Sequence, residues 1–206
     1  MDDLPPFAAV VLAGGRAARL GGRTKPQVRV GGRTLLEAAL TAVAGAAPRV
    51  VVGPPQPVPD GVRLVREQPP GGGPVPALAA GLAAVDDAAV VAVLAGDLPF
   101  VTPELVTELR RRLTGDGALV VDDTGRDQLL LGVWRTAALR PALAAVSGPA
   151  PLRAVLGRLS ATRYRPPVAA GAPAPWTDCD TPAELARARQ QAGDVGDGLD
   201  WGPRPG

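Results

Sequence analysis

Histidine is absent from this chain of 206 residues, and cysteine occurs once, at Cys179. Without histidine there is no imidazole general base, no Ser–His or Cys–His catalytic arrangement and no histidine-bound zinc. A single cysteine forms neither an intramolecular disulfide nor a cysteine-based metal site. Any catalysis must therefore depend on other groups, such as carboxylates, cationic side chains and backbone amides.

Aromatic residues and excess charge are also scarce. Aromatics make up 3% of the chain, so the core must consist of Ala, Val and Leu, and the net charge is only +2. The basic residues are scattered, and no aromatics interleave with them as a stacking surface would need, so we expect no nucleic-acid partner. The run at residues 110–112 is predicted to be the solvated end of a helix.

Long hydrophobic runs are missing too. No apolar stretch approaches the roughly 20 residues that span a bilayer, and residues 1–6 lack the basic region of a signal peptide. We therefore expect a cytoplasmic protein that does not enter a membrane.

Short apolar runs alternate with helical patterns along the chain. Strands are predicted at residues 7–13, 49–52, 62–66, 88–95, 118–122 and 129–134. Helices are predicted at residues 34–47, 77–85, 102–113, 136–146, 151–159 and 181–192. This alternation predicts an α/β fold with a mostly parallel sheet and helices on both faces. Residues 1–192 would form one domain, and the Gly-, Pro- and Asp-rich residues 193–206 are predicted to be disordered.

A Gly-rich loop follows the first predicted strand and contains the only lysine, Lys25. The chain uses arginine for its other 21 basic residues. Two glycine pairs, at 14–15 and 21–22, would let backbone amides approach an anion, and Arg16, Arg19, Arg23 and Lys25 could neutralise a triphosphate. Since Lys25 is followed by Pro26, this is not a Walker loop. The alternative is a flexible turn with solvated arginines.

Carboxylates occur in two further places. Asp97 follows the most apolar predicted strand, where ligands of parallel sheets bind, and Asp178 and Asp180 precede the last helix. In an extended segment Asp178 and Asp180 would point the same way. A chain that binds a triphosphate needs a divalent cation, and Mg²⁺ takes one or two carboxylates besides phosphate oxygens. Asp97 could instead form a turn, and Asp180 or Thr181 could cap the helix.

A third segment, Gly71-Gly72-Gly73-Pro74, precedes another predicted helix. Its missing side chains could let a planar base lie against the backbone, or the segment could be only a loop.

With these segments in this order, the sequence resembles the molybdenum cofactor guanylyltransferase family of nucleotidyltransferases, which have a nucleotide-diphospho-sugar-transferase-like fold. The first matching segment, residues 12–26, follows the pattern Leu-Ala-Gly-Gly-x-x-x-Arg-x-Gly-Gly-x-x-Lys. The others are residues 72–82, 95–100 and 178–185. The resemblance implies a three-layer α/β/α, Rossmann-like sandwich.

The resemblance also implies an activity: transfer of GMP from Mg-GTP to the terminal phosphate of molybdenum-loaded molybdopterin, with release of pyrophosphate. Further partners would be molybdoenzymes or their chaperones. The implied catalytic residues are Lys25, Arg19 and Asp97. The implied nucleotide-binding residues are Leu12, Ala13, Gly14, Gly15, Arg19, Lys25, Gly72, Gly73, Pro74 and Asp97. The implied Mg²⁺ ligands are Asp97 and Asp178 or Asp180.

Two positions depart from the family pattern. Thr24 stands where the family often has Asp, and Asp178-Cys179-Asp180 stands where guanylyltransferases often have Asn-x-Asn and the related cytidylyltransferases Asp-x-Asp. Gly72-Gly73-Pro74 favours guanine. Three alternatives stay open: CTP with molybdopterin, a nucleotide with a sugar phosphate, and a non-catalytic nucleotide-binding accessory protein. Because a phosphate acceptor is already anionic, the transfer needs no general base.

Overall fold

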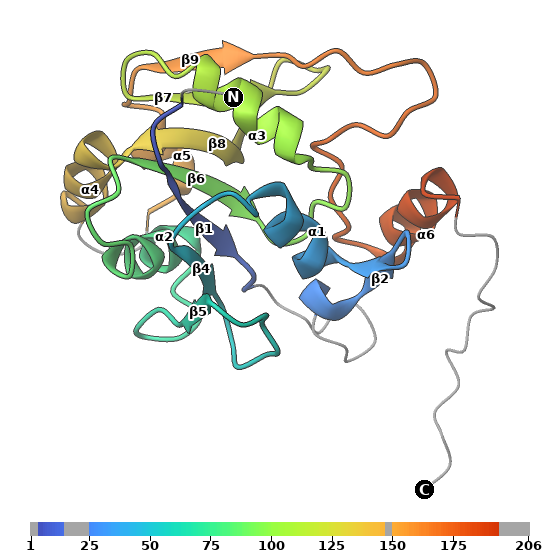
Figure 1. The fold of residues 1–206 in the computed structure, drawn as a ribbon, viewed down its shortest axis with the longest axis horizontal. Coiled ribbons are helices and arrows are strands. Elements are labelled where there is room, and N and C mark those ends of the chain that lie inside the picture. Colours follow the sequence, from blue (N-terminus) through green and yellow to red (C-terminus); the bar gives the residue numbers. More distant parts are fainter. Residues whose placement is uncertain (1–3, 15–24, 147–149, 194–206) are drawn as a thin grey trace, which may run out of the picture.

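A seven-stranded sheet forms the centre of the protein in the computed structural model, which describes residues 4–14, 25–146 and 150–193. The strands lie in the order β5-β4-β1-β6-β8-β7-β9 (Figure 1). Their bounds are Ala8–Leu12 (β1), Arg49–Val52 (β4), Val62–Val65 (β5), Val90–Ala95 (β6), Gly117–Val121 (β7), Asp127–Arg135 (β8) and Ala161–Tyr164 (β9).

Strand direction decides which residues meet at one edge of this sheet. Strands β5, β4, β1 and β6 run parallel, with Val10 of β1 paired to Val50 on one side and Val93 on the other. Strand β8 is antiparallel to β6 and to β7, and β9 is parallel to β7. The carboxyl ends of β5, β4, β1, β6 and β7 therefore share an edge with the beginning of β8. The predicted mostly parallel sheet is confirmed.

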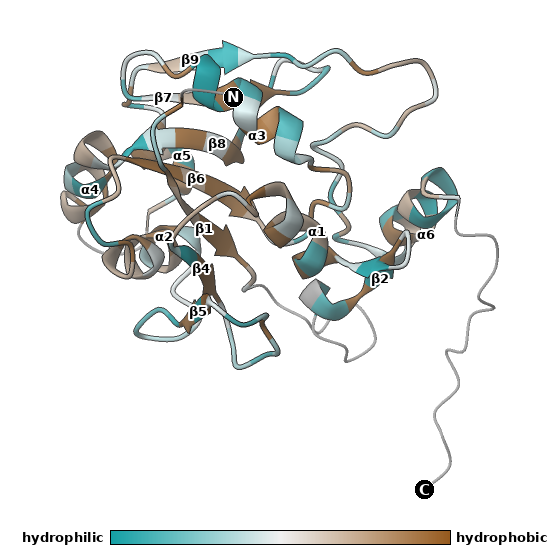
Figure 2. Ribbon diagram, viewed as in Figure 1, coloured by the Kyte–Doolittle hydropathy of each residue, from teal (hydrophilic) through white to brown (hydrophobic). Residues whose placement is uncertain are grey.

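Helices cover both faces of the sheet. On one face, α1 (Leu35–Ala42) and α3 (Pro103–Arg111) contribute to one hydrophobic core together with Ala9 and Val11 of β1. On the other face, α2 (Pro74–Ala83) packs against β1, and α4 (Thr136–Ala144) and α5 (Leu152–Leu156) pack against β8, in one core that includes Ala8 and Val10. Figure 2 shows hydrophobic central strands and, around them, helices that contain both hydrophobic and hydrophilic residues. These three layers confirm the predicted α/β/α sandwich.

Threonine caps begin three of the helices. The side chain of Thr102 accepts a hydrogen bond from the Leu105 amide at the start of α3, as the Thr-Pro-Glu sequence predicts. Thr34 forms a capping box with Glu37 at the start of α1, and Thr181 forms one with Glu184 at the start of α6 (Pro182–Gln191).

A small third core joins the segment after the Gly-rich loop to the last helix. The 3₁₀ turn η2 (Lys25–Gln27) leads into a hairpin of β2 (Arg29–Val30) and β3 (Arg33–Thr34), whose turn is Gly31-Gly32 with φ of +61° and +75°. The members of this small core are Val28, Val30, Leu35, Cys179, Leu185 and Ala188. It brings Lys25 close to the segment around Asp180, 155 residues further along the chain.

Some predicted bounds are wrong. Helix α1 ends at Ala42, not at residue 47, because the chain turns at Val43 although Val43 and Ala46 stay buried. Helix α2 begins at Pro74, three residues earlier than predicted, since Gly73 takes a φ of +93° that admits proline at the first helical position. The hairpin and β9 were not predicted, because two- and four-residue strands of mixed polarity show little periodicity.

Two other expectations concern membrane-spanning helices and the C-terminal tail. Within 4–14, 25–146 and 150–193, no helix has the length and apolarity that crossing a bilayer requires. Residues 194–206, most of the predicted disordered tail, lie outside the described part.

Candidate active site

The end of β1 lies tightly between two neighbouring strand ends. A Cβ atom on Gly53, after β4, would come within 2.9 Å of the Ala13 carbonyl oxygen, and one on Gly96, after β6, within 3.1 Å of the Ala13 Cα. The Ala13 amide donates to the Val52 carbonyl and the Leu12 carbonyl accepts from the Gly96 amide. These two groups are therefore used by the fold, which makes Gly14 and the Ala13 carbonyl the better candidates for contacting a ligand.

Lys25 connects two carboxylates from distant parts of the chain. Its Nζ donates to Oδ2 of Asp97, which follows β6, and to Oδ1 of Asp180, which precedes α6. The side chain of Lys25 is 15% exposed, whereas that of Asp97 is 23% and that of Asp180 is 67% exposed. The structure thus brings together three of the residues predicted to form the site.

The charges of this group influence one another. Burial by itself lowers the pKa of Lys25, but the carboxylates of Asp97 and Asp180 more than offset it, so the pKa stays above its usual 10.5. Burial raises the pKa of Asp178, and the nearby carboxylates of Asp180 and Asp97 raise it further. The site therefore holds a fully charged ammonium among crowded carboxylates.

The alternation of an extended segment places Asp178 and Asp180 on the same side. Both line the pocket, while Cys179 between them is fully buried in the small third core. The predicted common orientation of the two carboxylates is confirmed. Burial also raises the pKa of the Cys179 thiol to about 12, helped by the nearby Asp97 carboxylate. Cys179 thus holds the segment in place without being reactive.

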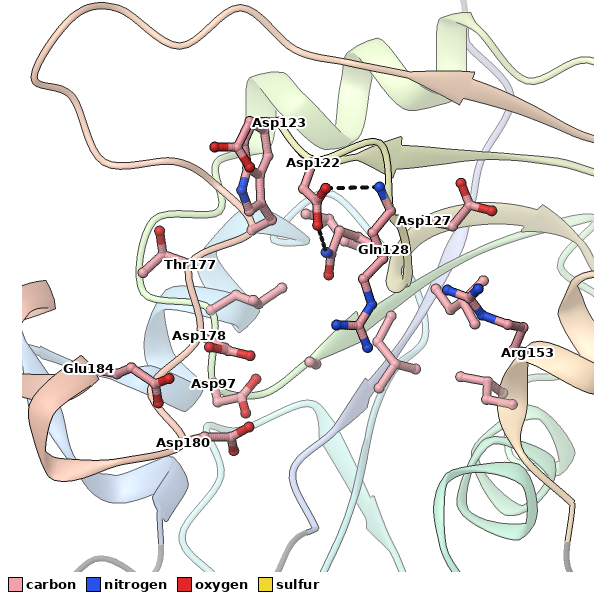
Figure 3. Close-up of a pocket in the computed structure, with 18 of the residues that line it drawn as sticks. Asp97, Asp122, Asp123, Asp127, Gln128, Arg153, Thr177, Asp178, Asp180 and Glu184 are labelled. Carbon is pink, nitrogen blue, oxygen red and sulfur yellow. Dashed lines mark hydrogen bonds between the residues drawn. The ribbon is translucent and has the colours of Figure 1, made fainter.

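Beside these carboxylates is a pocket of about 810 Å³. Figure 3 shows Asp97, Asp178 and Asp180 close together on one side, with Glu184 next to them and Arg153 across the pocket. Arg126 and Arg187 also line it, as does Trp176, whose ring packs against the core. One side of the pocket thus carries Asp97, Asp178 and Asp180, and the other carries arginines together with the carboxylates of the β7–β8 hairpin, Asp122, Asp123 and Asp127.

The hairpin between β7 and β8 forms one wall of the pocket and is held by Asp122. Its Oδ1 accepts hydrogen bonds from the Thr124 and Arg126 amides, both at 2.9 Å, and from the Thr124 hydroxyl, and its Oδ2 accepts one from Gln128 at 2.8 Å (Figure 3). These bonds, that from Thr124 above all, lower the pKa of Asp122 to about 2. Asp122 thus remains ionised and fixes the turn that carries Arg126.

In the glycine segment before α2, Gly72 is closely packed, whereas a Cβ on Gly71 or Gly73 would meet nothing within 4 Å. A Cβ on Gly72 would come within 2.8 Å of Pro76, and Gly73, the N-cap of α2, makes no side-chain capping bond. Because Pro74 and Pro76 have no amide hydrogen, few donors remain at this helix start. The segment therefore suits a flat uncharged group better than a phosphate.

The position of the Lys25 ammonium indicates whether Asp97 and Asp180 could bind a divalent cation together. Its ammonium is a monovalent cation held by one oxygen each from Asp97 and Asp180, so both side chains reach a common cation. The described ranges contain no group of three His, Cys, Asp or Glu residues arranged to hold a metal. Two carboxylates with further ligands from phosphate oxygens are what Mg²⁺ usually takes. Asp97 and Asp180 therefore fit the ion, and Asp178 lies beside them.

Other predicted residues fall outside the described part of the chain. Gly15, Arg19 and the other cations of the loop at residues 15–24 belong to this group. Conversely, Arg126 and Trp176 line the pocket without having been predicted. The turn sequence Asp-Thr-Gly at 123–125 is a hairpin signal that could have placed Arg126. Trp176 lies in a Pro-rich segment that gives no such signal.

This fold, with a cation position at the carboxyl ends of its strands, is typical of nucleotidyltransferases, and comparison with known families agrees. Residues 9–163 match the family described as the MobA-like NTP transferase domain. The chain belongs to this family and is a nucleotidyltransferase. The matched range includes Lys25 and Asp97 and ends before Asp178 and Asp180.

Curated relatives support the assignment. A protein of Mycobacterium tuberculosis (strain ATCC 25618 / H37Rv) named "Probable molybdenum cofactor guanylyltransferase" is 38% identical over 141 residues, which cover 65% of this chain and 70% of that protein. A protein of the same name from Mycobacterium avium (strain 104) is 35% identical over 144 residues, or 66% of this chain and 73% of the other.

Solved structures share the fold. Molybdopterin-guanine dinucleotide biosynthesis protein A from Archaeoglobus fulgidus has a TM-score of 0.66 at 20% identity, over 91% of this chain and 100% of that chain. The 2-C-methyl-D-erythritol 4-phosphate cytidylyltransferase from Thermus thermophilus has a TM-score of 0.65 at 23% identity, over 92% and 100%. Rv0371C from Mycobacterium tuberculosis H37Rv, solved in complex with manganese, has a TM-score of 0.67 at 20% identity, over 90% of this chain and 99% of that chain.

Proposed function

We propose that this enzyme transfers GMP from Mg-GTP to the terminal phosphate of molybdenum-loaded molybdopterin and releases pyrophosphate, within a catalytic domain at residues 1–192. The observation that carries the proposal is the meeting of Asp97 and Asp180 on one cation, between the strand ends and the pocket. The name shared by the mycobacterial relatives supports guanylyl transfer and a molybdopterin acceptor.

The nucleotide would lie over the ends of the parallel strands. The backbone of Ala13 and Gly14 would face the ribose and base, and the flat face at Gly72, Gly73 and Pro74 would accept the base, since side chains there would obstruct it. Lys25, with Arg19 and the backbone around Leu12 and Gly15 as the family resemblance implies, would contact the triphosphate. A magnesium ion held by Asp97 and Asp180 would offset charge on the triphosphate and on the departing pyrophosphate.

The acceptor would occupy the 810 Å³ pocket. Arg126 and Arg153 are exposed on its wall, and within the described residues neither guanidinium pairs with a carboxylate. Guanidinium groups bind phosphate oxygens well. Trp176 would offer a flat surface to the pterin rings. Asp122, Asp123 and Asp127 also lie on this wall, so Arg126, Arg153 and Trp176 are the groups on it that would suit an anionic acceptor with a planar ring system.

The transfer needs no proton removal by the protein. An oxygen of the acceptor phosphate, already negatively charged, attacks the α-phosphorus of GTP. The bond from the α-phosphorus to the bridging oxygen breaks, and pyrophosphate leaves with that oxygen. Lys25 and the arginines hold the two anions close together, so catalysis comes from positioning and charge neutralisation. This mechanism suits a chain that lacks histidine.

Nucleotide titration tests the proposal. Calorimetry with GTP, CTP, ATP and UTP, with and without Mg²⁺, should give Mg²⁺-dependent binding that is strongest for GTP. Pyrophosphate release should then require molybdenum-loaded molybdopterin. An enzyme that binds no nucleotide, or that releases pyrophosphate equally well without the acceptor, would contradict the proposal.

Cytidylyl transfer to molybdopterin is the second candidate. Asp178 and Asp180, in place of the Asn-x-Asn that guanylyltransferases often have, favour it, because the family resemblance links Asp-x-Asp to cytidylyltransferases. The same titration separates the candidates: stronger Mg²⁺-dependent binding of CTP than of GTP would select cytidylyl transfer.

A further inference from the structure

The only lysine of the chain occupies the position at which a divalent cation would be expected. Its Nζ lies between Oδ2 of Asp97 and Oδ1 of Asp180, two oxygens that the metal would need. Asp97 follows β6 of the main sheet, whereas Lys25 and Asp180 flank the small third core. One ammonium thus connects the main sheet to the segments packed around α6.

We propose that Lys25 substitutes for the metal in the nucleotide-free enzyme and must leave before the metal binds. The nucleotide would draw Lys25 onto its phosphates, so metal and nucleotide enter together and free metal is excluded. This inference rests on the proposed function for the identity of the nucleotide only. It concerns the exchange of one cation for another between two named carboxylates.

Charge explains why the two cations exclude each other. A metal bound by Asp97 and Asp180 would lie next to the ammonium, and both cations would compete for the same oxygens in a half-buried site where repulsion is poorly screened. Without any cation, Asp97, Asp178 and Asp180 would be crowded carboxylates that repel one another. Lys25 therefore stabilises the closed arrangement until a triphosphate supplies negative charge for it.

The choice of lysine fits this exchange. Arginine serves for all other basic positions, yet its wide planar fork prefers to bind one carboxylate through two bonds. Lysine carries a compact charge on four flexible methylene groups. It can bridge two carboxylates and then turn to phosphate oxygens without movement of the backbone.

Mn²⁺ binding without nucleotide is the first test, because the paramagnetic ion reports directly on site occupancy. Lys25→Met removes the ammonium and adds a thioether that hard cations avoid. We expect this variant to bind free Mn²⁺ about tenfold more tightly than the wild type, since repulsion is removed. The same variant should bind Mn-GTP more weakly, because the phosphates lose a cation.

Two variants serve as controls. Arg158→Gln removes one positive charge from an exposed residue outside the pocket and should leave Mn²⁺ binding unchanged. Lys25→Arg restores a cation and should again exclude free Mn²⁺.

Unchanged Mn²⁺ affinity in Lys25→Met would mean that Lys25 does not occupy the metal position. Weaker Mn²⁺ affinity would mean that Lys25 only holds the site together. Either result overturns the proposal.

A second measurement uses the wild type and needs no substitution. Because Lys25 is the only lysine, selective ¹³C labelling of lysine Cε gives a single NMR signal in a chain without a lysine-containing tag. Mg²⁺ alone should leave this signal in place, and Mg²⁺ with GTP should shift it. A saturable shift with Mg²⁺ alone would overturn the proposal. If GTP is not the nucleotide, the Mn²⁺-only and Mg²⁺-only results still decide it.

Discussion

The two halves of the sheet edge differ in the groups that they present to a ligand. Where the parallel strands β4, β1 and β6 end, backbone atoms and glycines dominate, and Gly53 and Gly96 enclose Ala13 without room for a methyl group. Where β7 turns into β8, side chains dominate, and Asp122 holds the turn that carries Arg126. Lys25, Asp97 and Asp180 lie where the two halves meet.

This difference indicates how each half can change. At the ends of β4, β1 and β6 a side chain in place of Gly53 or Gly96 would clash with the Ala13 backbone, so we expect the geometry of this half to be fixed. A site made of exposed side chains can be altered by single substitutions without disturbing the strands. Under the proposed function, the acceptor half could therefore be changed while the nucleotide half stays intact. The predictions below test this separation.

The largest effect is expected where the halves meet. Asp97→Asn should reduce turnover about a hundredfold or more, because the cation position loses one of its two charged ligands. The variant should unfold at nearly the same temperature as the wild type. Asp60→Asn, at an exposed loop residue, is the matched control for loss of a carboxylate. Wild-type turnover in Asp97→Asn would show that the Asp97 carboxylate is not needed for catalysis.

The backbone half is tested by Gly53→Ala. The added methyl group would meet the Ala13 carbonyl oxygen at 2.9 Å and the Gln56 amide nitrogen at 3.0 Å, so the end of β1 must shift. We expect nucleotide affinity to fall about tenfold and the free energy of unfolding to fall by about 1–3 kcal/mol. Gly45→Ala, where the new atom finds ordinary contact at 3.9 Å, should change neither. Calorimetry and denaturant unfolding give both values.

The side-chain half is tested by Arg153→Ala. Loss of this guanidinium, which pairs with no carboxylate of the described residues, should raise the KM for the phosphorylated acceptor about tenfold, with kcat and GTP affinity nearly unchanged. Arg158→Ala, just after the same helix but outside the pocket, is the control. If Arg153→Ala weakened GTP binding instead, the two halves would not be separate.

The smallest effect concerns the turn between β7 and β8. The pKa of Asp122 is lowered to about 2, so its ionised form stabilises the fold above the unfolded value of 3.8, and this contribution is lost as pH falls toward 2. Asp122→Asn should lower the free energy of unfolding by about 1–2 kcal/mol at pH 7, and the difference should shrink as the pH falls from 4 toward 2. Denaturant titrations of both proteins at several pH values measure it, with Asp123→Asn as the neighbouring control.

The sequence predicts the parallel half well. Apolar runs that end in glycine or aspartate locate the ends of β1 and β6, and parallel strands bring such ends to one edge, so Lys25 and Asp97 could be placed near each other. Alternation along an extended segment places Asp178 and Asp180 on one side. These arguments need only local patterns and one rule of topology.

The side-chain half was less predictable for a physical reason. The direction of β8 depends on a short turn after β7, and only an antiparallel β8 brings its beginning, with Gln128, to the same edge as Asp97. Trp176 lies in an irregular segment, and its position is set by packing against the core, which no periodicity in the sequence reveals. Arg126 and Trp176 therefore became visible on this wall only in three dimensions, whereas Arg153 and residues 128–131 could be named from the sequence as candidates for it.

Cys179 gives the small third core a practical use. It is the only thiol in the chain, it is fully buried, and its pKa of about 12 leaves almost no thiolate at neutral pH. A thiol reagent can modify it only when the segment between Asp178 and Asp180 separates from the core. The rate of labelling at Cys179 therefore reports how often this segment opens, and with it how often the carboxylates of Asp178 and Asp180 move away from the core.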